Sequence, residues 1–188
     1  MVPQGLTTYS LGQCMNTLIS ISKFIVKALV GVAIASAVFV FAMGFADGPW
    51  GVVPGGAFSE SAKPTPQDWS FTKNLDTVEF QLIDPVSSRT SWIMEHDNRA
   101  FIPSGYMNST VGKLWKHWPI YAEKNGAALL RIDGEVYTVT LQRTKNPELL
   151  RPVMSELARK YISVEPPLDS MLDEVSSNNL WVFELVRG

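Results

Sequence analysis

Residues 28–46 carry no charged side chain, and nearly all of them are apolar. An α-helix rises about 1.5 Å per residue, so a helix over this stretch is about 28 Å long, close to the thickness of the hydrocarbon core of a bilayer. The side chain of Lys27 can extend to the interface, which lets the apolar run begin at Phe24. The stretch therefore predicts a transmembrane anchor over residues 24–46, with the lipid bilayer as its partner.

The charges that flank this stretch indicate its orientation. Lys23 and Lys27 are the only charged residues before Asp47, and lysines close to a span tend to stay in the cytoplasm. We therefore expect a single-pass membrane protein with a signal anchor. Residues 1–23 form its cytoplasmic N-terminal segment, and the C-terminal domain lies outside, which in a bacterium is the periplasm.

A cleaved signal peptide is the alternative to a retained anchor. Residues 44–46 are Gly-Phe-Ala, with small residues at the two positions that a signal peptidase reads. The apolar run is longer than the ~7–15 residues of a signal peptide, and the segment before it is also long. Both lengths favour the retained anchor.

Composition excludes several classes of function. The chain has 16 basic and 18 acidic side chains, and without Lys23 and Lys27 the counts for residues 47–188 are 14 and 18, a net charge of −4. Such a domain has no electrostatic reason to bind nucleic acid. Cys14 is the only cysteine, which excludes an intramolecular disulfide and a zinc site built from thiolates. The sequence also shows no metal-ligand spacing.

Residues 47–70 differ in composition from the segments on both sides. They are rich in Gly, Pro and Ser, which resist regular structure, and they predict a tether. Trp50 fits the belt of aromatic residues found at membrane interfaces. Residues 71–188 then have a length that suits one compact domain.

The pattern after residue 70 is typical of a mainly β domain with some helix. We expect about six antiparallel strands, over residues 77–83, 89–95, 100–104, 127–132, 135–143 and 180–186. Two or three helices are expected, over residues 111–118, 150–162 and 168–175. We therefore expect these strands to form a small closed or half-open barrel, because closure removes the exposed edges of short strands.

Turn residues and prolines set the predicted boundaries. Asp133-Gly134 predicts a two-residue hairpin, and residues 96–99 predict another. Pro119 is expected to end the first helix near Trp118. Asn146 and Pro147 are typical of a helix start, but Pro152 places the start of the main helix nearer residue 150.

Three stretches carry a resemblance to a known family. They are a hairpin over residues 92–105, a helix and apolar strand over 113–132, and a hairpin with following helix over 133–161. Together they resemble the split β-barrel flavin-binding family, which includes pyridoxamine-phosphate oxidases and deazaflavin-dependent nitroreductases. The resemblance covers residues 76–162 and implies a split-barrel domain over residues 71–188.

The resemblance also implies a site for a cofactor, either FMN or a deazaflavin. In that family, basic and hydroxyl side chains hold the cofactor's phosphate, and an aromatic ring covers the flavin. Carried over by position, the phosphate ligands would be Arg89, Thr90, Ser104, Lys113 and Lys116, with Trp115 or Tyr106 against the ring. Phosphate is well suited to such charge-assisted donors.

Two functions stay open from the sequence. One is a membrane-anchored flavin- or deazaflavin-dependent oxidoreductase. The other is a cofactor-free accessory or interaction subunit of a larger membrane protein complex. Some members of the fold bind haem, for which His117 would be the candidate ligand, although a histidine on a helix surface is the simpler interpretation. The family resemblance further implies a homodimer.

Overall fold

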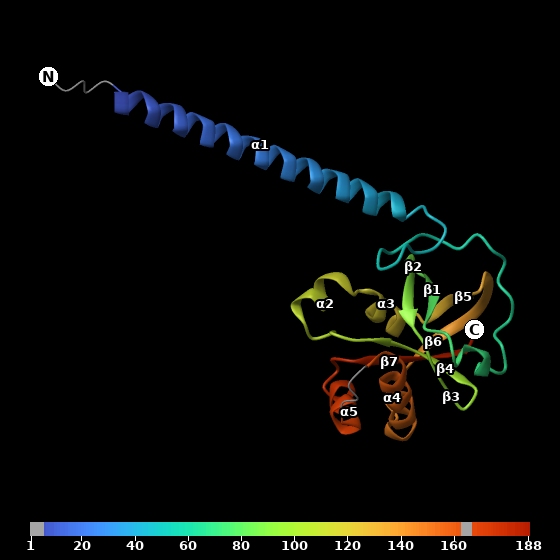
Figure 1. Cartoon of the computed structure of the whole chain (residues 1–188). Helices are drawn as coiled ribbons and strands as arrows, with labels where there is room; N and C mark the ends of the chain where they lie inside the picture. Colours follow the sequence, from blue (N-terminus) through green and yellow to red (C-terminus); the bar gives the residue numbers. More distant parts are fainter. Residues whose placement is uncertain (1–5, 163–166) are drawn as a thin grey trace. The chain divides into compact units, whose positions relative to one another are not determined.

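The computed structural model describes residues 6–162 and 167–188. The chain divides into two compact units, Met1–Ala42 and Met43–Gly188 (Figure 1). We call the second one the barrel unit, and we describe each unit by itself.

Where it is described, the first unit is a single long helix, α1 (Leu6–Met43). Its segment Gly12–Met43 is long and apolar enough to cross a membrane, judged by length and composition, and no other helix in the described residues is. The helix ends at Met43, before the predicted end of the span at residue 46. The structure thus contains the candidate anchor that the uncharged stretch predicts.

The barrel unit is built around one antiparallel sheet of seven strands, in the order β2-β1-β5-β6-β7-β4-β3. This confirms the mainly β class with additional helices. The strands are β1 (Thr77–Ile83), β2 (Val86–Trp92), β3 (Met94–His96), β4 (Arg99–Ser104), β5 (Ala127–Ile132), β6 (Glu135–Thr144) and β7 (Trp181–Arg187).

The order of the strands requires the sheet to curl. β2 and β3 stand at opposite ends of the strand order, yet a single residue, Ile93, connects them along the chain. The two ends of the sheet must therefore approach each other, which makes the sheet a half-barrel (Figure 1). Our expectation of one strand over residues 89–95 was wrong, because the chain changes its pairing partner at Ile93, from β1 to β4.

Two side chains of one helix satisfy the backbone at this junction. The N–H of Ile93 donates to Tyr161 Oη at 3.0 Å, and its carbonyl oxygen lies 2.7 Å from that hydroxyl and 2.8 Å from Lys160 Nζ. The ring of Tyr161 also stacks on Trp92, with centroids 4.6 Å apart. Burial raises the pKa of Tyr161 to about 12, so the hydroxyl keeps its proton at neutral pH.

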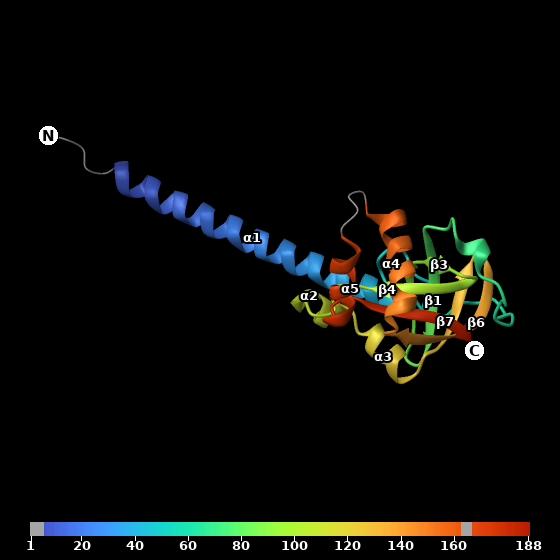
Figure 2. The same ribbon diagram turned by 90° about the horizontal axis from the view of Figure 1, so that it is seen from below.

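Apolar side chains fill two cores, one on each face of the curled sheet. Strand residues alternate between the faces, so Ile102 lies in the core inside the curl and Phe101 lies in the core outside it. The inner core also takes Trp118 and Ala122 from a short helix, and the outer core lies beneath two longer helices. Figure 2 shows these two helices, α4 (Pro147–Tyr161) and α5 (Leu168–Ser176), on the same side of the sheet.

Four α-helices accompany the sheet in the described residues, one more than the two or three that we expected. They are α2 (Thr110–Trp115), α3 (Trp118–Lys124), α4 (Pro147–Tyr161) and α5 (Leu168–Ser176), and η1 (Ser70–Thr72) adds a short 3-10 turn. The extra helix arises because Pro119 stands in the first turn of α3, where its missing N–H has no intrahelical partner to lose.

Pro152 likewise does not delay the start of the main helix. α4 begins at Pro147, and the side chain of Asn146 accepts the N–H of Glu148 at 3.0 Å, as the capping signal predicted. The helix continues through Pro152 because its inner face is buried from Leu150 to Ala158, and that burial offsets one lost backbone hydrogen bond. Our expectation of a start near residue 150 was therefore wrong.

The segment expected as a tether has little regular structure, but it is packed on the barrel unit. Gly55 pairs with Ser88 and Lys63 pairs with Tyr137 as isolated bridges. Phe58 and Trp69 are buried. Residues 47–70 therefore cover the barrel instead of standing apart from it.

We predict that Tyr161→Phe destabilises the barrel unit while keeping the ring stacked on Trp92. The buried N–H of Ile93 would lose its acceptor, which costs about 1–3 kcal/mol. Urea unfolding of the full chain in mild detergent measures this loss. Tyr121→Phe, which alters an exposed tyrosine on α3, is the matched control, and equal midpoints for the two variants would contradict the role of the hydroxyl.

Candidate functional site

Arg89 lies on the inner face of the curled sheet. Its partner across the β1–β2 ladder is Phe80, whose ring lies in the inner core, and directly opposed residues of an antiparallel pair share one face. The arginine is half-buried, its Nε atom is inaccessible to solvent, and that atom has no hydrogen-bond partner in the described part of the chain. Burial lowers the pKa of Arg89 from its usual value.

Lys116 brings a second positive charge to the same place. It follows the last residue of α2, and its Nζ donates to the carbonyl oxygen of Gly105 at 3.0 Å and lies 5.6 Å from the centre of the Tyr106 ring. Burial lowers the pKa of Lys116, and the charge of Arg89 lowers it further. The two half-buried positive charges thus interact unfavourably.

Among the described residues, neither cation has an acidic partner. Eight ion pairs hold charged side chains together over residues 6–162 and 167–188, and none includes Arg89 or Lys116. Two like charges that are half-buried without a counter-ion raise the free energy of the fold. An anion bound between them would lower it.

Ser104 belongs to the same end of the barrel. It is the last residue of β4, is almost fully buried, and directly precedes Gly105, whose carbonyl accepts from Lys116. Its Oγ lies 3.5 Å from Met107 Sδ, a weak acceptor. The hydroxyl therefore has no strong acceptor among these contacts.

Thr90 and Lys113 do not join the two cations in a buried site. Thr90 is the neighbour of Arg89 on β2 and so lies on the opposite face of the sheet. Lys113 is exposed on α2. The side chain of Trp115 lies outside the part of the chain that the structure describes.

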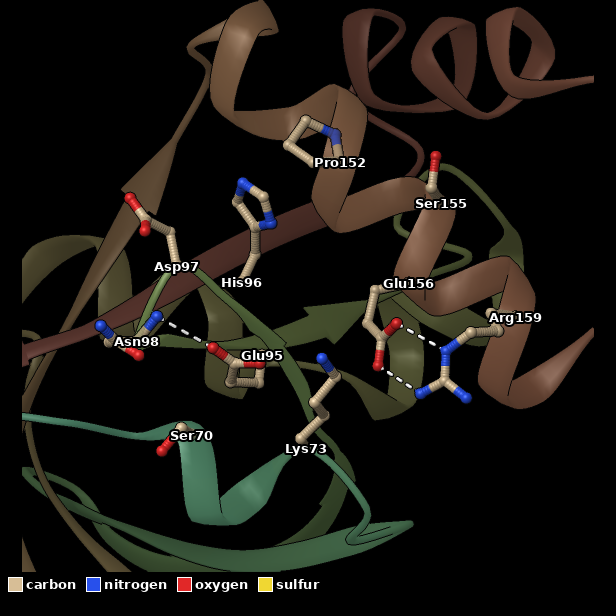
Figure 3. Close-up of a pocket in the computed structure, with 10 residues that line it drawn as sticks. All are labelled: Ser70, Lys73, Glu95, His96, Asp97, Asn98, Pro152, Ser155, Glu156 and Arg159. Atoms are coloured by element: carbon tan, nitrogen blue, oxygen red, sulfur yellow. Dashed lines mark hydrogen bonds and ion pairs between the residues drawn. The ribbon is translucent and has the colours of Figure 1, made fainter.

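A hollow of about 540 Å³ lies away from these cations, between η1, the β3–β4 turn and α4 (Figure 3). Two of its acidic side chains have partners. Glu95 accepts the N–H of Asn98 at 2.9 Å, and Glu156 holds Arg159 through two bonds of 2.6 and 2.7 Å. His96 lines the hollow, but no group of three or more metal-binding side chains occurs in the described residues. None of the residues that we predicted as cofactor ligands lines this hollow.

Sequence reasoning missed a cluster of charges around Arg131 on β5. This guanidinium contacts the carboxylates of Asp47, Glu60 and Glu79 at 2.8, 3.2 and 2.7 Å. It also lies 4.2 Å from the centre of the Phe58 ring. We call these residues the Arg131 cluster. It joins positions up to 84 apart in the chain, so no local sequence signal announces it.

Gly48 makes the close approach of chain and arginine possible. Its φ is +82°, a conformation that disfavours side chains, and a Cβ there would stand 1.9 Å from Nη2 of Arg131. The hydrogen bond from Ser59 and the contact with Arg131 hold the pKa of Asp47 below its usual value. The Arg131 cluster therefore fastens the chain at Asp47 to the sheet.

Comparison with protein-family models finds no match for this chain, and no curated protein matches it. The resemblance to split-barrel flavin proteins thus rests on the residues already described.

We predict that the stability cost of the Lys116 charge depends on pH. The pKa of Lys116 is lowered in the folded chain from 10.5, so over the alkaline range below that value the unfolded chain binds more protons and stability rises with pH. The free energy of unfolding of the wild type, relative to Lys116→Met, should rise between pH 7 and pH 10. Urea unfolding in phosphate-free buffer measures it.

Lys113→Met is the matched control, because that lysine is exposed on the same helix. Its difference from the wild type should stay nearly constant over the same range. A difference for Lys116→Met that does not change with pH would contradict the burial of its charge.

Proposed function

We propose that the barrel unit binds a phosphate-bearing ligand at Arg89 and Lys116, and that the ligand is FMN or a deazaflavin of an oxidoreductase. The observation that carries the proposal is the meeting of two half-buried cations that have no acidic partner in the described residues. Such an arrangement raises the energy of the free protein and favours binding of an anion.

The residues present suit the phosphate of such a cofactor. The Nε of Arg89 is a buried donor without an acceptor, and a guanidinium offers phosphate two parallel donors. Lys116 adds a point charge, and the hydroxyl of Ser104 lies at the same end of the barrel. Tyr106, which is 71% exposed and lies beside Lys116, presents an aromatic face for a planar ring.

A bound flavin would supply the hydride chemistry. The part of this chain would be to hold the phosphate with Arg89 and Lys116 and to orient the ring against Tyr106. Haem is a weaker candidate, because its iron needs an axial ligand, and His117 lies exposed just before α3.

We predict that Arg89→Gln and Lys116→Gln each weaken FMN binding by about 10- to 100-fold, the value of one charge-assisted hydrogen bond of 1.5–3 kcal/mol. Quenching of FMN fluorescence by the full chain in mild detergent measures the affinity. Lys113→Gln should bind as the wild type does.

Riboflavin, which lacks the phosphate, and inorganic phosphate alone separate the two parts of the ligand. Phosphate should compete with FMN, and riboflavin should bind equally to the wild type and both Gln variants. Circular dichroism checks that each variant is folded. FMN affinity that is the same in all four proteins, or no FMN binding at all, would contradict the proposed site.

A cofactor-free accessory subunit of a membrane complex is the second candidate. Thr90 lies on the opposite face of the sheet from Arg89 and Lys113 is exposed, which favours this function, because fewer buried groups then remain to hold a whole nucleotide. Exposed aromatic side chains such as Phe71 and Trp92 offer contacts for a partner. A colourless protein that co-purifies with one membrane protein in constant ratio would favour this function, and light scattering of the same sample tests the homodimer.

We also propose that α1 stays in the membrane, with its N-terminus in the cytoplasm and the barrel unit outside. Lys23 and Lys27 support this orientation. The single cysteine, Cys14, is an exposed natural reporter.

A membrane-impermeant maleimide should label Cys14 only after intact cells are permeabilised. In a Cys14→Ser chain, a cysteine placed at exposed Lys145 should be labelled without permeabilisation. Sodium carbonate should leave the chain in the membrane fraction. Release by carbonate would contradict the anchor, and the opposite labelling pattern would contradict the orientation.

A further inference from the structure

The chain just after α1 forms a loop with exposed apolar side chains. Trp50 and Val53 exchange two backbone hydrogen bonds of 3.0 Å, which close a tight turn. Phe45, Trp50 and Val52 are 80%, 67% and 90% exposed. We call residues 44–53 the membrane-facing loop, after the role that we propose for it.

This loop is held firmly on the side that faces the sheet. The N–H of Gly56 donates to the carbonyl oxygen of Ala46 at 3.0 Å, and Gly55 exchanges two bonds of 3.0 Å with Ser88 on β2. Asp47, the only charged residue of the loop, contacts Arg131 and accepts from Ser59 Oγ at 2.8 Å. The single charge is therefore neutralised by the barrel unit, and the side chains left exposed are mostly apolar.

We propose that the membrane-facing loop lies in the interfacial region of the bilayer and holds the barrel unit against the membrane surface. This inference rests on the proposed anchoring by α1. The loop follows the candidate span directly in sequence, which brings it to the level of the headgroups. Tryptophan favours that level, and Phe45 and Val52 would bury apolar area in the acyl boundary.

The Arg131 cluster gives this contact a mechanical consequence. If the loop were bound to lipid but made no contact with the barrel, the barrel unit could still rotate freely relative to the membrane. Here Asp47 is fastened to β5 through Arg131, so insertion of the loop restricts the tumbling of the whole barrel unit. Sites on the barrel would then keep a fixed height above the membrane.

Spin labels in vesicles of phosphatidylcholine and phosphatidylglycerol test where the loop lies. In a full-length Cys14→Ser chain, the label is placed by Val52→Cys or, as a matched control, by Ser61→Cys, which is exposed further along the same segment. We expect the label at 52 to be more accessible to oxygen, which dissolves in lipid, and the label at 61 to be more accessible to a water-soluble nickel chelate. Preference for the chelate at both positions would overturn the proposal.

The tumbling of the barrel unit gives a second readout. A dye on Lys145→Cys in the same background reports it through its residual fluorescence anisotropy. Trp50→Ser with Val52→Ser should lower that anisotropy, and an unchanged value would overturn the proposal.

Two further measurements assign a failure to its cause. Dipolar broadening between labels at position 52 that grows with protein density would show a second copy covering the loop, which also overturns the proposal. Carbonate extraction of the same vesicles tests the anchor separately. A chain that stays in the pellet without a lipid-exposed loop leaves the anchor standing and rejects the loop, whereas release into the supernatant rejects both.

Discussion

The barrel unit depends on the hydrogen bonds made by the backbone N–H and C=O of one residue, Ile93. At Ile93 the chain leaves the ladder with β1 and enters the ladder with β4, so its N–H and C=O need partners from outside both ladders. Tyr161 and Lys160, at the end of α4, supply them. Because α4 also packs on the outer core, the same helix covers the sheet and joins its two ends. A buried peptide group without partners would cost a large part of the stability of such a domain.

The sequence predicted the class of the fold because class follows from short-range patterns. Alternating apolar residues marked β1, β5 and β6, and Asp133-Gly134 adopts the hairpin with positive φ that the pair indicates. The change of pairing partner at Ile93 could not be predicted from the local sequence, because residues 86–96 have a strand-like pattern on both sides of Ile93. Two prolines misled the prediction of helix boundaries. Pro119 stands in the first turn of α3, where proline is tolerated, and Pro152 lies inside α4, where burial of the helix face offsets its cost. What stayed unpredictable was decided by contacts between residues distant in the chain.

The candidate site was likewise predictable only in part from the sequence. Arg89 and Lys116 were carried over by position from the family resemblance, and in the fold their charges interact. Thr90 was chosen beside Arg89, although adjacent strand residues face opposite sides, a limit that the alternation of the sheet already implied. The Gly- and Pro-rich composition of residues 47–70 predicted irregular chain. It could not predict that Gly48, Gly55 and Gly56 are buried, since glycine serves a close approach as readily as a flexible link.

The attachment of residues 46–60 to the sheet bears on how the barrel unit could ever be cut free. A protease must draw an extended stretch of chain into its cleft, and mobile loops are the places where it finds one. Here the chain beyond Met43 is bonded to the sheet through Ala46, Asp47 and Gly55. Shedding of the domain from its helix therefore requires local unfolding around Arg131, and the rate of release becomes a property of that small cluster of charges.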